Sequence, residues 1–272
     1  FVLWKPSTDT QPGWDSPWGR GRPGWHIECS AMAKKHLGPT FDIHGGGIDL
    51  IFPHHENEIA QSECCHDDAP FAHYWMHNGH LVVNGEKMSK SLGNFFTVED
   101  LLHQYPGEAI RLTLLATHYR QPLDWRHEVV LQNKAVLDRF YTALEGCPDG
   151  TGSVPDTYLS ALHDDLNIPE ALSVLHETVS QIHTEKNPAQ KKILQRTLKT
   201  SAGLLGLLQV PSKTWFQGGS EVDTAWIEDM IQKRLVAKQN KDFNGADAIR
   251  DTLKQKGIVL EDMGQKTIWK KK

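Results

Sequence analysis

A thiol, two imidazoles and a carboxylate lie close enough in this sequence to form a metal site. Cys29 ends the run Trp-His-Ile-Glu-Cys, and a second polar cluster, Pro-His-His-Glu-Asn-Glu, occupies positions 53–58. If that cluster is helical, His54 and Glu58 share one face, and His55 with Glu58 remains an alternative pair. Cys29, His54 and Glu58 together give the mixed sulfur, nitrogen and oxygen donors that zinc accepts at catalytic sites. The spacing is not that of a zinc finger, so a free thiol beside a polar helix face also fits these residues.

A second group of residues could act on a triphosphate. Lys87 and Lys90 belong to the string Lys-Met-Ser-Lys-Ser, which follows a hairpin signal in which Asn84-Gly85 suits a type I′ turn. Two lysines in a small, flexible loop can close over a triphosphate and stabilise charge at its α-phosphate. Most lysine- and serine-containing loops are exposed polar turns, but this string is far more specific than that composition.

The elements that must position these residues are short and of mixed type. We expect helices at 25–37 and 53–64, strand segments at 41–44 and 48–52, and a glycine-rich turn at 45–47. Helical periodicity takes over from about residue 97, and linkers rich in Gly, Pro and Ser interrupt it. We expect four parts: a catalytic domain at 1–96, a helical connector at 97–150, a helical bundle at 151–212, and a small basic α+β domain at 213–272.

The composition excludes several classes of protein. Hydrophobic residues make up 39% of the chain and charged residues 23%, which suits a globular protein with real cores. No apolar run approaches the ~18 residues that a membrane span needs, and four cysteines in 272 residues give no disulfide framework. We therefore expect a reducing, cytoplasmic setting. Phe1–Pro6 read as a strand already in progress, so we expect this sequence to begin inside a domain.

The formal net charge of −5 hides an uneven distribution. From Lys233 to Lys272 there are eleven Lys or Arg residues against five Asp or Glu residues. A basic C-terminal unit on an acidic body can contact nucleic acid through that end alone. A solvated helical face with a frayed tail is the other interpretation of such a charge run.

Three segments carry a resemblance to the cysteinyl-tRNA synthetase family of class I aminoacyl-tRNA synthetases. They are GRPGWHIECS at 21–30, FDIHGGGIDLIFPHHENEIAQSE at 41–63, and WMHNGHLVVNGEKMSKSLGN at 75–94, which contains the class I KMSKS signature. The resemblance covers essentially the whole chain, but it corresponds only to the C-terminal part of the family's chain. The family's HIGH signature belongs upstream; His-Asn-Gly-His at 77–80 imitates it by accident, because it runs into the hairpin.

The resemblance implies a fold and a reaction. The fold is α/β: the second half of a class I Rossmann-type nucleotide-binding domain, followed by an α-helical bundle and a small α+β C-terminal domain. The reaction activates cysteine with ATP and magnesium to cysteinyl-adenylate and transfers it to the 3′ end of the tRNA for cysteine. One zinc ion per chain selects the cysteine thiolate over the serine hydroxyl, which a pocket that measures shape discriminates poorly. The family also implies a monomer with no stable protein partner and no membrane association.

The resemblance also assigns roles to individual residues. It makes Cys29, His54 and Glu58 metal ligands, Trp25 and Asp49 substrate-binding residues, and Lys90 with Lys87 the catalytic lysines. It assigns ATP binding to Gly45, Gly46, Gly47, Asp49 and Lys90. It suggests that Trp269, Lys270 and Lys271 contact tRNA, the indole by stacking on an exposed anticodon loop and the lysines by neutralising phosphates.

Two other functions compete with this interpretation. A zinc-dependent ligase of the mycothiol pathway also activates cysteine but joins it to an amino sugar; the string SLGN after the lysine loop and the basic C-terminal unit favour tRNA. A non-catalytic RNA-binding or regulatory remnant of a synthetase is the second alternative. We expect little or no turnover from these 272 residues alone, because the nucleotide site would lack one wall.

Overall fold

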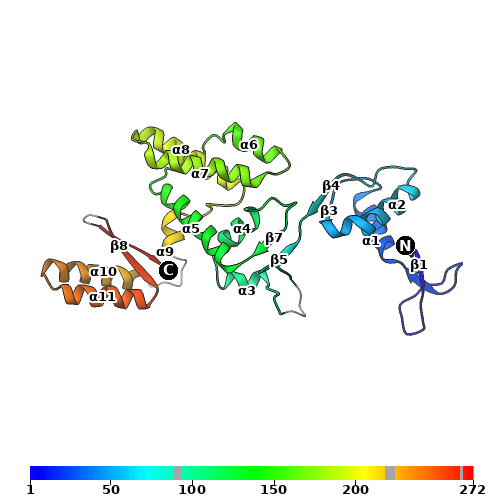
Figure 1. Cartoon of the computed structure of the whole chain (residues 1–272), viewed down its shortest axis with the longest axis horizontal. Coiled ribbons are helices and arrows are strands. Elements are labelled where there is room, and N and C mark those ends of the chain that lie inside the picture. Colours follow the sequence, from blue (N-terminus) through cyan, green and yellow to red (C-terminus); the bar gives the residue numbers. More distant parts are fainter. Residues whose placement is uncertain (89–92, 218–223, 264–265, 272) are drawn as a thin grey trace. The chain divides into compact units, whose positions relative to one another are not determined.

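The chain forms two compact units in the computed structural model, which describes residues 1–88, 93–217, 224–263 and 266–271. One unit comprises residues 1–97 and 114–126, and the other comprises 98–113 and 127–272 (Figure 1). The first mixes strands with helices and the second is largely helical, so the predicted mixture of α and β structure is confirmed. No helix within the described ranges is long and apolar enough to cross a bilayer.

A pair of parallel strands organises the first unit. β3 (Phe41–Gly47) pairs with β4 (Ala72–Asn78) in a register that runs from Phe41 opposite Ala72 to Gly47 opposite Asn78. Parallel strands need a crossover of a dozen or more residues. The chain between them supplies it through a 3₁₀ turn (Ile48–Leu50), a π-helical turn (Ile51–His55) and α2 (Glu56–Cys65), and α2 packs against α1 (Trp25–Leu37).

Two expectations for this region are wrong. Residues 48–52 form helical turns instead of a strand, and Gly45–Gly47 extend β3 instead of forming a turn. The glycines pair with Met76–His77 and Asn78 of β4, a strand some thirty positions later in the sequence. That non-local pairing supplies backbone hydrogen bonds that local propensity does not reveal.

Two smaller sheets complete the first unit. β5 (Leu81–Val83) lies between the antiparallel β6 (Glu86–Lys87) and the parallel β7 (Leu123–Trp125). Asn84 and Gly85 adopt φ values of 52° and 81°, so the predicted hairpin turn with two left-handed residues is confirmed. β1 (Trp4–Pro6) and β2 (Gly21–Pro23) form a short antiparallel ribbon ahead of α1.

Helices build the second unit. They are α3 (Val98–Leu102), α4 (Gly107–Leu115), α5 (His127–Ala143), α6 (Asp156–His163), α7 (Ile168–Thr184), α8 (Pro188–Gly203) and α9 (Ser212–Gln217). The expected apolar face of α7 is buried, with Leu175, Val179 and Ile182 at most 1% exposed. The side chains of Asn167 and Asn187 cap the N-termini of α7 and α8, which explains why these two helices begin where they do.

The Glu108 carboxylate joins three segments of this unit. Its oxygens accept hydrogen bonds from the Leu208 amide at 2.8 Å, the Gln209 amide at 3.1 Å and the Tyr141 hydroxyl at 2.9 Å. Burial and the adjacent Glu108 carboxylate together raise the pKa of Tyr141 well above its usual range. The Glu108 side chain on α4 thus links α5 to the segment that follows α8.

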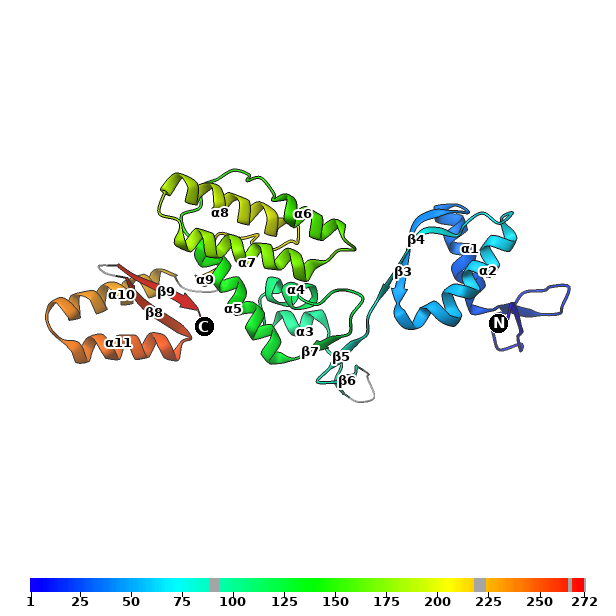
Figure 2. The same ribbon diagram turned by 45° about the horizontal axis from the view of Figure 1, so that its top comes forward.

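The C-terminal residues form a small module of two helices on a hairpin. α10 (Thr224–Gln239) and α11 (Phe243–Gln255) lie beside the antiparallel strands β8 (Ile258–Met263) and β9 (Lys266–Lys271) (Figure 2). Trp269 is 3% exposed and packs in their core with Ile227, Leu253 and Leu260. The indole therefore contributes to folding of the module and is not presented to solvent.

A single acidic side chain clamps α10 to the hairpin. The Asp262 carboxylate accepts two hydrogen bonds from the Arg234 guanidinium at 2.9 Å, one from Lys238 at 2.8 Å and one from Thr267 at 2.7 Å. These donors, Arg234 first, hold the pKa of Asp262 far below its usual range. Bidentate pairing with an arginine also fixes the geometry of the contact.

We expect Glu108→Ala to lower the free energy of unfolding by about 2 kcal/mol, because it leaves two backbone amides and a buried hydroxyl without their acceptor. Denaturant titration measures this change. Glu177→Ala on the exposed side of α7 is the control and should stay within about 0.5 kcal/mol of the unsubstituted chain. Equal effects of the two substitutions would contradict the role of Glu108.

Acid should weaken the C-terminal module through Asp262. Because folding depresses the pKa of Asp262, its stabilisation is present above the unfolded value of about 3.9 and is lost as the pH falls below it. Thermal unfolding from pH 6 to pH 3 should therefore show a smaller acid-induced loss in Asp262→Asn, which is already less stable at pH 6. If the unsubstituted chain and Asp262→Asn lose the same stability between pH 6 and pH 3, Asp262 is not the origin of the acid effect.

Candidate metal and nucleotide site

Glu58 is a buried carboxylate surrounded by histidines. It lies in the first turn of α2, is 5% exposed, and approaches the His44 Nε2 atom on β3 to 3.1 Å. Within the described part of the chain, the ligand atoms of His44, His55 and Glu58 all lie within 4.8 Å of one another. Glu58 Oε2 nevertheless accepts no hydrogen bond of good geometry from any described group. A buried carboxylate oxygen without a donor is unfavourable unless a cation balances it.

Cys29 on α1 lies near the same carboxylate. Burial, followed by the neighbouring Glu58 charge, raises the pKa of Cys29 to about 11. The thiol therefore keeps its proton at neutral pH unless a metal ion replaces it. Cys29 and Glu58 are 29 positions apart in sequence and come near each other because α1 packs against α2.

His54 faces a different neighbour. Its Nδ1 atom lies 2.9 Å from His26 Nε2, and its ring lies 4.6 Å from the Trp25 ring. His54 and Glu58 were expected to share one face of an α-helix. They do not, because α2 begins only at Glu56 and His54 belongs to the wider π-helical turn before it. The structure thus brings Cys29 near Glu58, and it places the predicted ligand His54 against Trp25 and His26, outside the group of His44, His55 and Glu58.

His54 and His55 each use one ring nitrogen to contact another histidine: His54 Nδ1 lies toward His26, and His55 Nδ1 lies 2.9 Å from His77 Nε2. Among the described residues, no hydrogen bond is found to the Nε2 atom of either ring. Metal-bound histidines commonly have their second nitrogen held in this way, which fixes the ring orientation. Burial, followed by the nearby His44, lowers the pKa of His55 and so favours its neutral, metal-binding form.

The glycines of β3 leave room for the cluster of Glu58 and the histidines around it. A β-carbon on Gly46 would lie 3.0 Å from both His55 Cε1 and Leu50 Cδ1, closer than ordinary van der Waals contact. Asp49 follows in the exposed 3₁₀ turn at the carboxyl end of β3. Ligands of α/β proteins bind at this end of parallel strands, so the placement of Gly45, Gly47 and Asp49 suits a nucleotide.

Trp25 is 64% exposed, which argues against ordinary core packing. Its ring also lies near His26, with the two centroids 5.9 Å apart and nearly parallel. An exposed indole beside two imidazoles offers a flat surface next to His54, at the start of the helix that carries Cys29. This position fits the predicted role in a substrate pocket.

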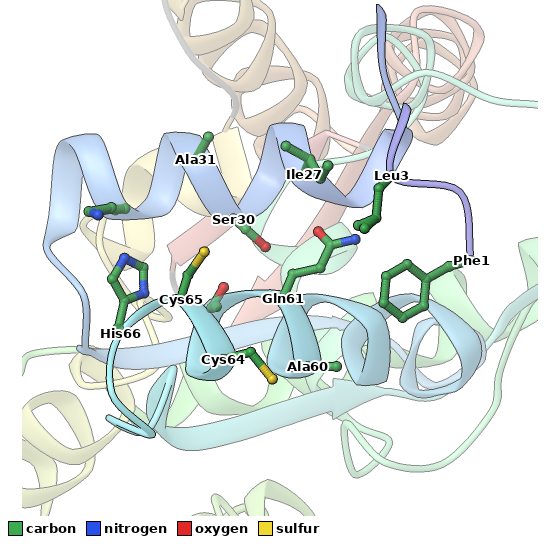
Figure 3. A pocket seen from close by; sticks show the side chains of 12 residues that line it. Phe1, Leu3, Ile27, Ser30, Ala31, Ala60, Gln61, Cys64, Cys65 and His66 are labelled. Carbon is green, nitrogen blue, oxygen red and sulfur yellow. The ribbon is translucent and has the colours of Figure 1, made fainter. Parts of the chain in front are cut away.

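An apolar cavity of about 610 Å³ lies between α1 and α2 (Figure 3). Ser30, Gln61 and Cys65 are among its lining residues, and no predicted site residue is. Figure 3 shows the Ser30 and Cys65 side chains directed into the space between the helices. The cavity therefore does not contain the chemistry of the cluster, and we do not assign the active site to it.

The remaining predicted residues have mixed outcomes. Lys90 lies outside the described residues, and of Lys87 only the backbone, in β6, is described. The stacking of Trp269 on tRNA needs correction, because its indole is buried in the C-terminal core. Lys270 sits 4.7 Å from the centre of the Phe216 ring and pairs with Glu261 at 2.9 Å, whereas the side chain of Lys271 is not described.

Three histidines of the cluster were not among the predicted ligands: His26, His44 and His77. His44 has one usable sequence signal, since it directly precedes the three glycines. His77 belongs to the accidental His-Asn-Gly-His string and has no such signal. It occupies β4 opposite Gly46, and this strand register brings it to His55.

Comparison with known proteins agrees with this architecture. Residues 1–135 match the family model of the tRNA synthetases class I (C) catalytic domain, and residues 157–209 match the DALR domain. A crystal structure of the LeuRS–tRNA–LeuAMS ternary complex from Agrobacterium radiobacter K84 superposes with a TM-score of 0.53 at 17% identity, covering 71% of this chain and 32% of that one. This likeness supports the fold alone.

Curated relatives are much closer in sequence. The cysteine–tRNA ligase of Rhodospirillum rubrum is 54% identical over 278 residues, covering 100% of this chain and 61% of the relative. That of Paramagnetospirillum magneticum is 56% identical over 279 residues, again covering 100% and 61%. The chain thus spans about three fifths of the length of these relatives.

The family match places residues 1–135 in the catalytic domain of class I tRNA synthetases, and the parallel strand pair with its crossover fits that domain. Identity of this level continues through both the catalytic and the helical domain. Within the class, the chain belongs to the cysteine–tRNA ligase family.

We expect Gly46→Ala to disturb the cluster, because the new methyl group must displace His55 by a few tenths of an ångström. The substitution should cost about 1 kcal/mol of stability and weaken zinc binding measured by chelator competition. Gly203→Ala is the matched control, since its β-carbon meets nothing closer than 3.8 Å. Zinc affinity that is unchanged in Gly46→Ala would show that His55 can move without consequence.

Proposed function

We propose that this chain forms part of an enzyme that ligates cysteine to its tRNA in two steps. In the first, the cysteine carboxylate attacks the α-phosphate of ATP, giving cysteinyl-adenylate and pyrophosphate. In the second, a ribose hydroxyl at the tRNA 3′ end attacks the acyl group and releases AMP. The observation that carries the proposal is identity of 54–56% to cysteine–tRNA ligases along the entire chain.

The first step needs no general base, because the substrate carboxylate is already the nucleophile. Its rate depends on positioning and on stabilisation of the charge that develops on the phosphates. We assign the adenylate to the carboxyl end of β3, where Gly45–Gly47 allow close backbone approach and the exposed Asp49 can accept hydrogen bonds from a ribose or an ammonium group. We assign stabilisation of the departing pyrophosphate to Lys90, with Lys87 in support.

The donors around Glu58 fit zinc. Cys29 supplies sulfur, Glu58 supplies an oxygen without a hydrogen-bond donor, and His54 or His55 supplies a nitrogen whose ring is already oriented by a second histidine. When bound, zinc supplies a soft Lewis acid that distinguishes a sulfur ligand from a hydroxyl oxygen. Trp25, exposed beside His54, would close the pocket around the small substrate side chain and limit access of water.

The division of the chain follows from these roles. We assign catalysis to residues 1–96 and the connection to the tRNA-binding part to residues 97–150. Residues 151–212 form the helical bundle, and residues 213–272, with Lys270 and Lys271, approach the anticodon. The buried Trp269 supports the position of Lys270 on β9 and does not itself stack on a base.

Cysteine-dependent ATP–pyrophosphate exchange, measured in the longest natural chain that contains this sequence, tests the proposal. We expect Cys29→Ser and Glu58→Gln to lower zinc affinity by at least about 100-fold, since even residues that only orient metal ligands contribute about 10–100-fold. Exchange activity and the preference for cysteine over serine should fall with it. Cys64→Ser, at an exposed cysteine outside the cluster, is the matched control.

The single variants His54→Ala and His55→Ala decide which histidine binds zinc. The ligand is the histidine whose replacement by alanine abolishes binding of one zinc ion per chain. Exchange activity that persists in zinc-free Cys29→Ser would contradict the metal assignment, and absence of exchange in the intact natural chain would favour a non-catalytic remnant. Transfer of cysteine to an amino sugar instead of tRNA would identify the mycothiol-type reaction.

A further inference from the structure

The hairpin that carries Lys87 is short. β5 has three residues and β6 has two, and they pair through Val82 with Lys87 and Val83 with Glu86. A two-stranded hairpin is at best marginally stable by itself in water. The position of this hairpin must therefore be set by contacts outside its two strands.

The third strand of the sheet holds one side of the hairpin. β7 pairs in parallel with β5, with Val82 opposite Asp124 and Val83 opposite Trp125. Val83 and Trp125 are both buried, at 4% and 7% exposed. β6 lies on the other side of β5, so strand pairing with β7 does not reach it. A contact to the turn is needed to fix the second strand.

Asp124 on β7 makes that contact. Its Oδ1 atom accepts a hydrogen bond from the Gly85 amide at 3.0 Å. The preceding amide, that of Asn84, donates to the Trp125 carbonyl at 3.2 Å. Asn84 and Gly85 are the two left-handed residues of the turn, with φ values of 52° and 81°. β7 thus binds both residues at which the chain reverses into β6.

The Asp124 side chain is itself held in place. It is 28% exposed, and its Oδ2 atom accepts a hydrogen bond from the Arg126 Nε atom at 2.7 Å. The pKa of Asp124 is lowered, chiefly because the Gly85 amide donates to it, so the group is a carboxylate at neutral pH. Hydrogen bonds to an ionised acceptor are roughly twice as strong as those between neutral groups. One oxygen therefore holds the turn while the other is oriented by Arg126.

Formation of the turn does not require this contact. Asn-Gly is already a preferred sequence for a type I′ turn, so the local sequence is enough to reverse the chain. An acceptor supplied by another strand decides instead where the turn lies. Placement matters for a group that stabilises developing charge, because a misplacement of about 1 Å can lower a rate by about 100-fold.

We propose that Asp124 is a positioning residue for the catalytic lysines. By holding Gly85 it fixes β6, and with it the backbone of Lys87 and the point from which the chain continues toward Lys90 (Figure 2). The inference rests on the proposed function, because it takes these lysines to stabilise the departing pyrophosphate. Asp124 acts through the backbone of the hairpin and is assigned no contact with a substrate.

Steady-state pyrophosphate exchange in the longest natural chain that contains this sequence tests the proposal. Asp124→Val keeps a residue that favours a strand but removes the acceptor. Its kcat should fall by about tenfold or more. The KM for cysteine and the zinc affinity measured by chelator competition should not change. A fall in kcat at constant KM is typical of an interaction made only in the transition state.

Two control variants isolate the acceptor. Asp124→Asn keeps a side-chain carbonyl that can accept from Gly85, so its kcat should stay within about threefold of the unsubstituted chain, since only the charge assistance is lost. Asp149→Ala removes an exposed carboxylate from the linker between α5 and α6 and should leave kcat unchanged. Amide hydrogen exchange of the peptide at 81–88, measured by mass spectrometry, reports on the hairpin without reference to activity. It should be faster in Asp124→Val and unchanged in Asp124→Asn.

An unchanged kcat in Asp124→Val, or an equal loss in Asp124→Val and Asp124→Asn, would overturn this inference and leave the proposed function intact. Loss of zinc and cysteine binding together with exchange activity would also overturn it, because Asp124 would then support the whole domain and not the hairpin. Absence of pyrophosphate exchange in the unsubstituted natural chain would overturn both the inference and the proposed function.

Discussion

The chemistry of the first unit depends on one buried carboxylate, that of Glu58, whose Oε2 atom has no hydrogen-bond partner among the described residues. The packing of α2 on α1 removes Glu58 from water. Its neighbours include the Cys29 thiol, whose pKa burial raises, and the His55 imidazole, whose pKa burial lowers. A buried negative charge in such surroundings is unfavourable until a cation joins it.

The parallel strand pair explains how distant residues reach this carboxylate. β3 brings His44, β4 brings His77, and the crossover between them brings His54, His55 and Glu58. Glycine at position 46 leaves the space that His55 occupies, so the strand and the crossover turn can approach closely. The site and the fold therefore depend on the same contacts, and substitutions in the strands should affect binding as well as stability.

In the second unit, two acidic side chains hold the structure together. Glu108 accepts hydrogen bonds that tie α4 to α5 and to the end of the bundle, and Asp262 accepts hydrogen bonds that tie α10 to the C-terminal hairpin. In both cases the donors include groups on segments that are distant in sequence.

The sequence by itself determined the mixture of helices and strands in the first part of the chain, the helices of the bundle, and the hairpin turn at Asn84-Gly85. These follow from local signals: the period of apolar residues and the demand of a type I′ turn for left-handed residues. The donor types of Cys29 and Glu58 indicate zinc chemistry in the same local way, and that assignment stays a prediction. Only the tertiary structure decided that Gly45–Gly47 continue a strand, that His54 turns toward His26, and that the Trp269 indole is internal. Each of these depends on a partner far away in sequence, since strand pairing, a widened helical turn and core packing are set by what lies across the contact and not by neighbouring residues.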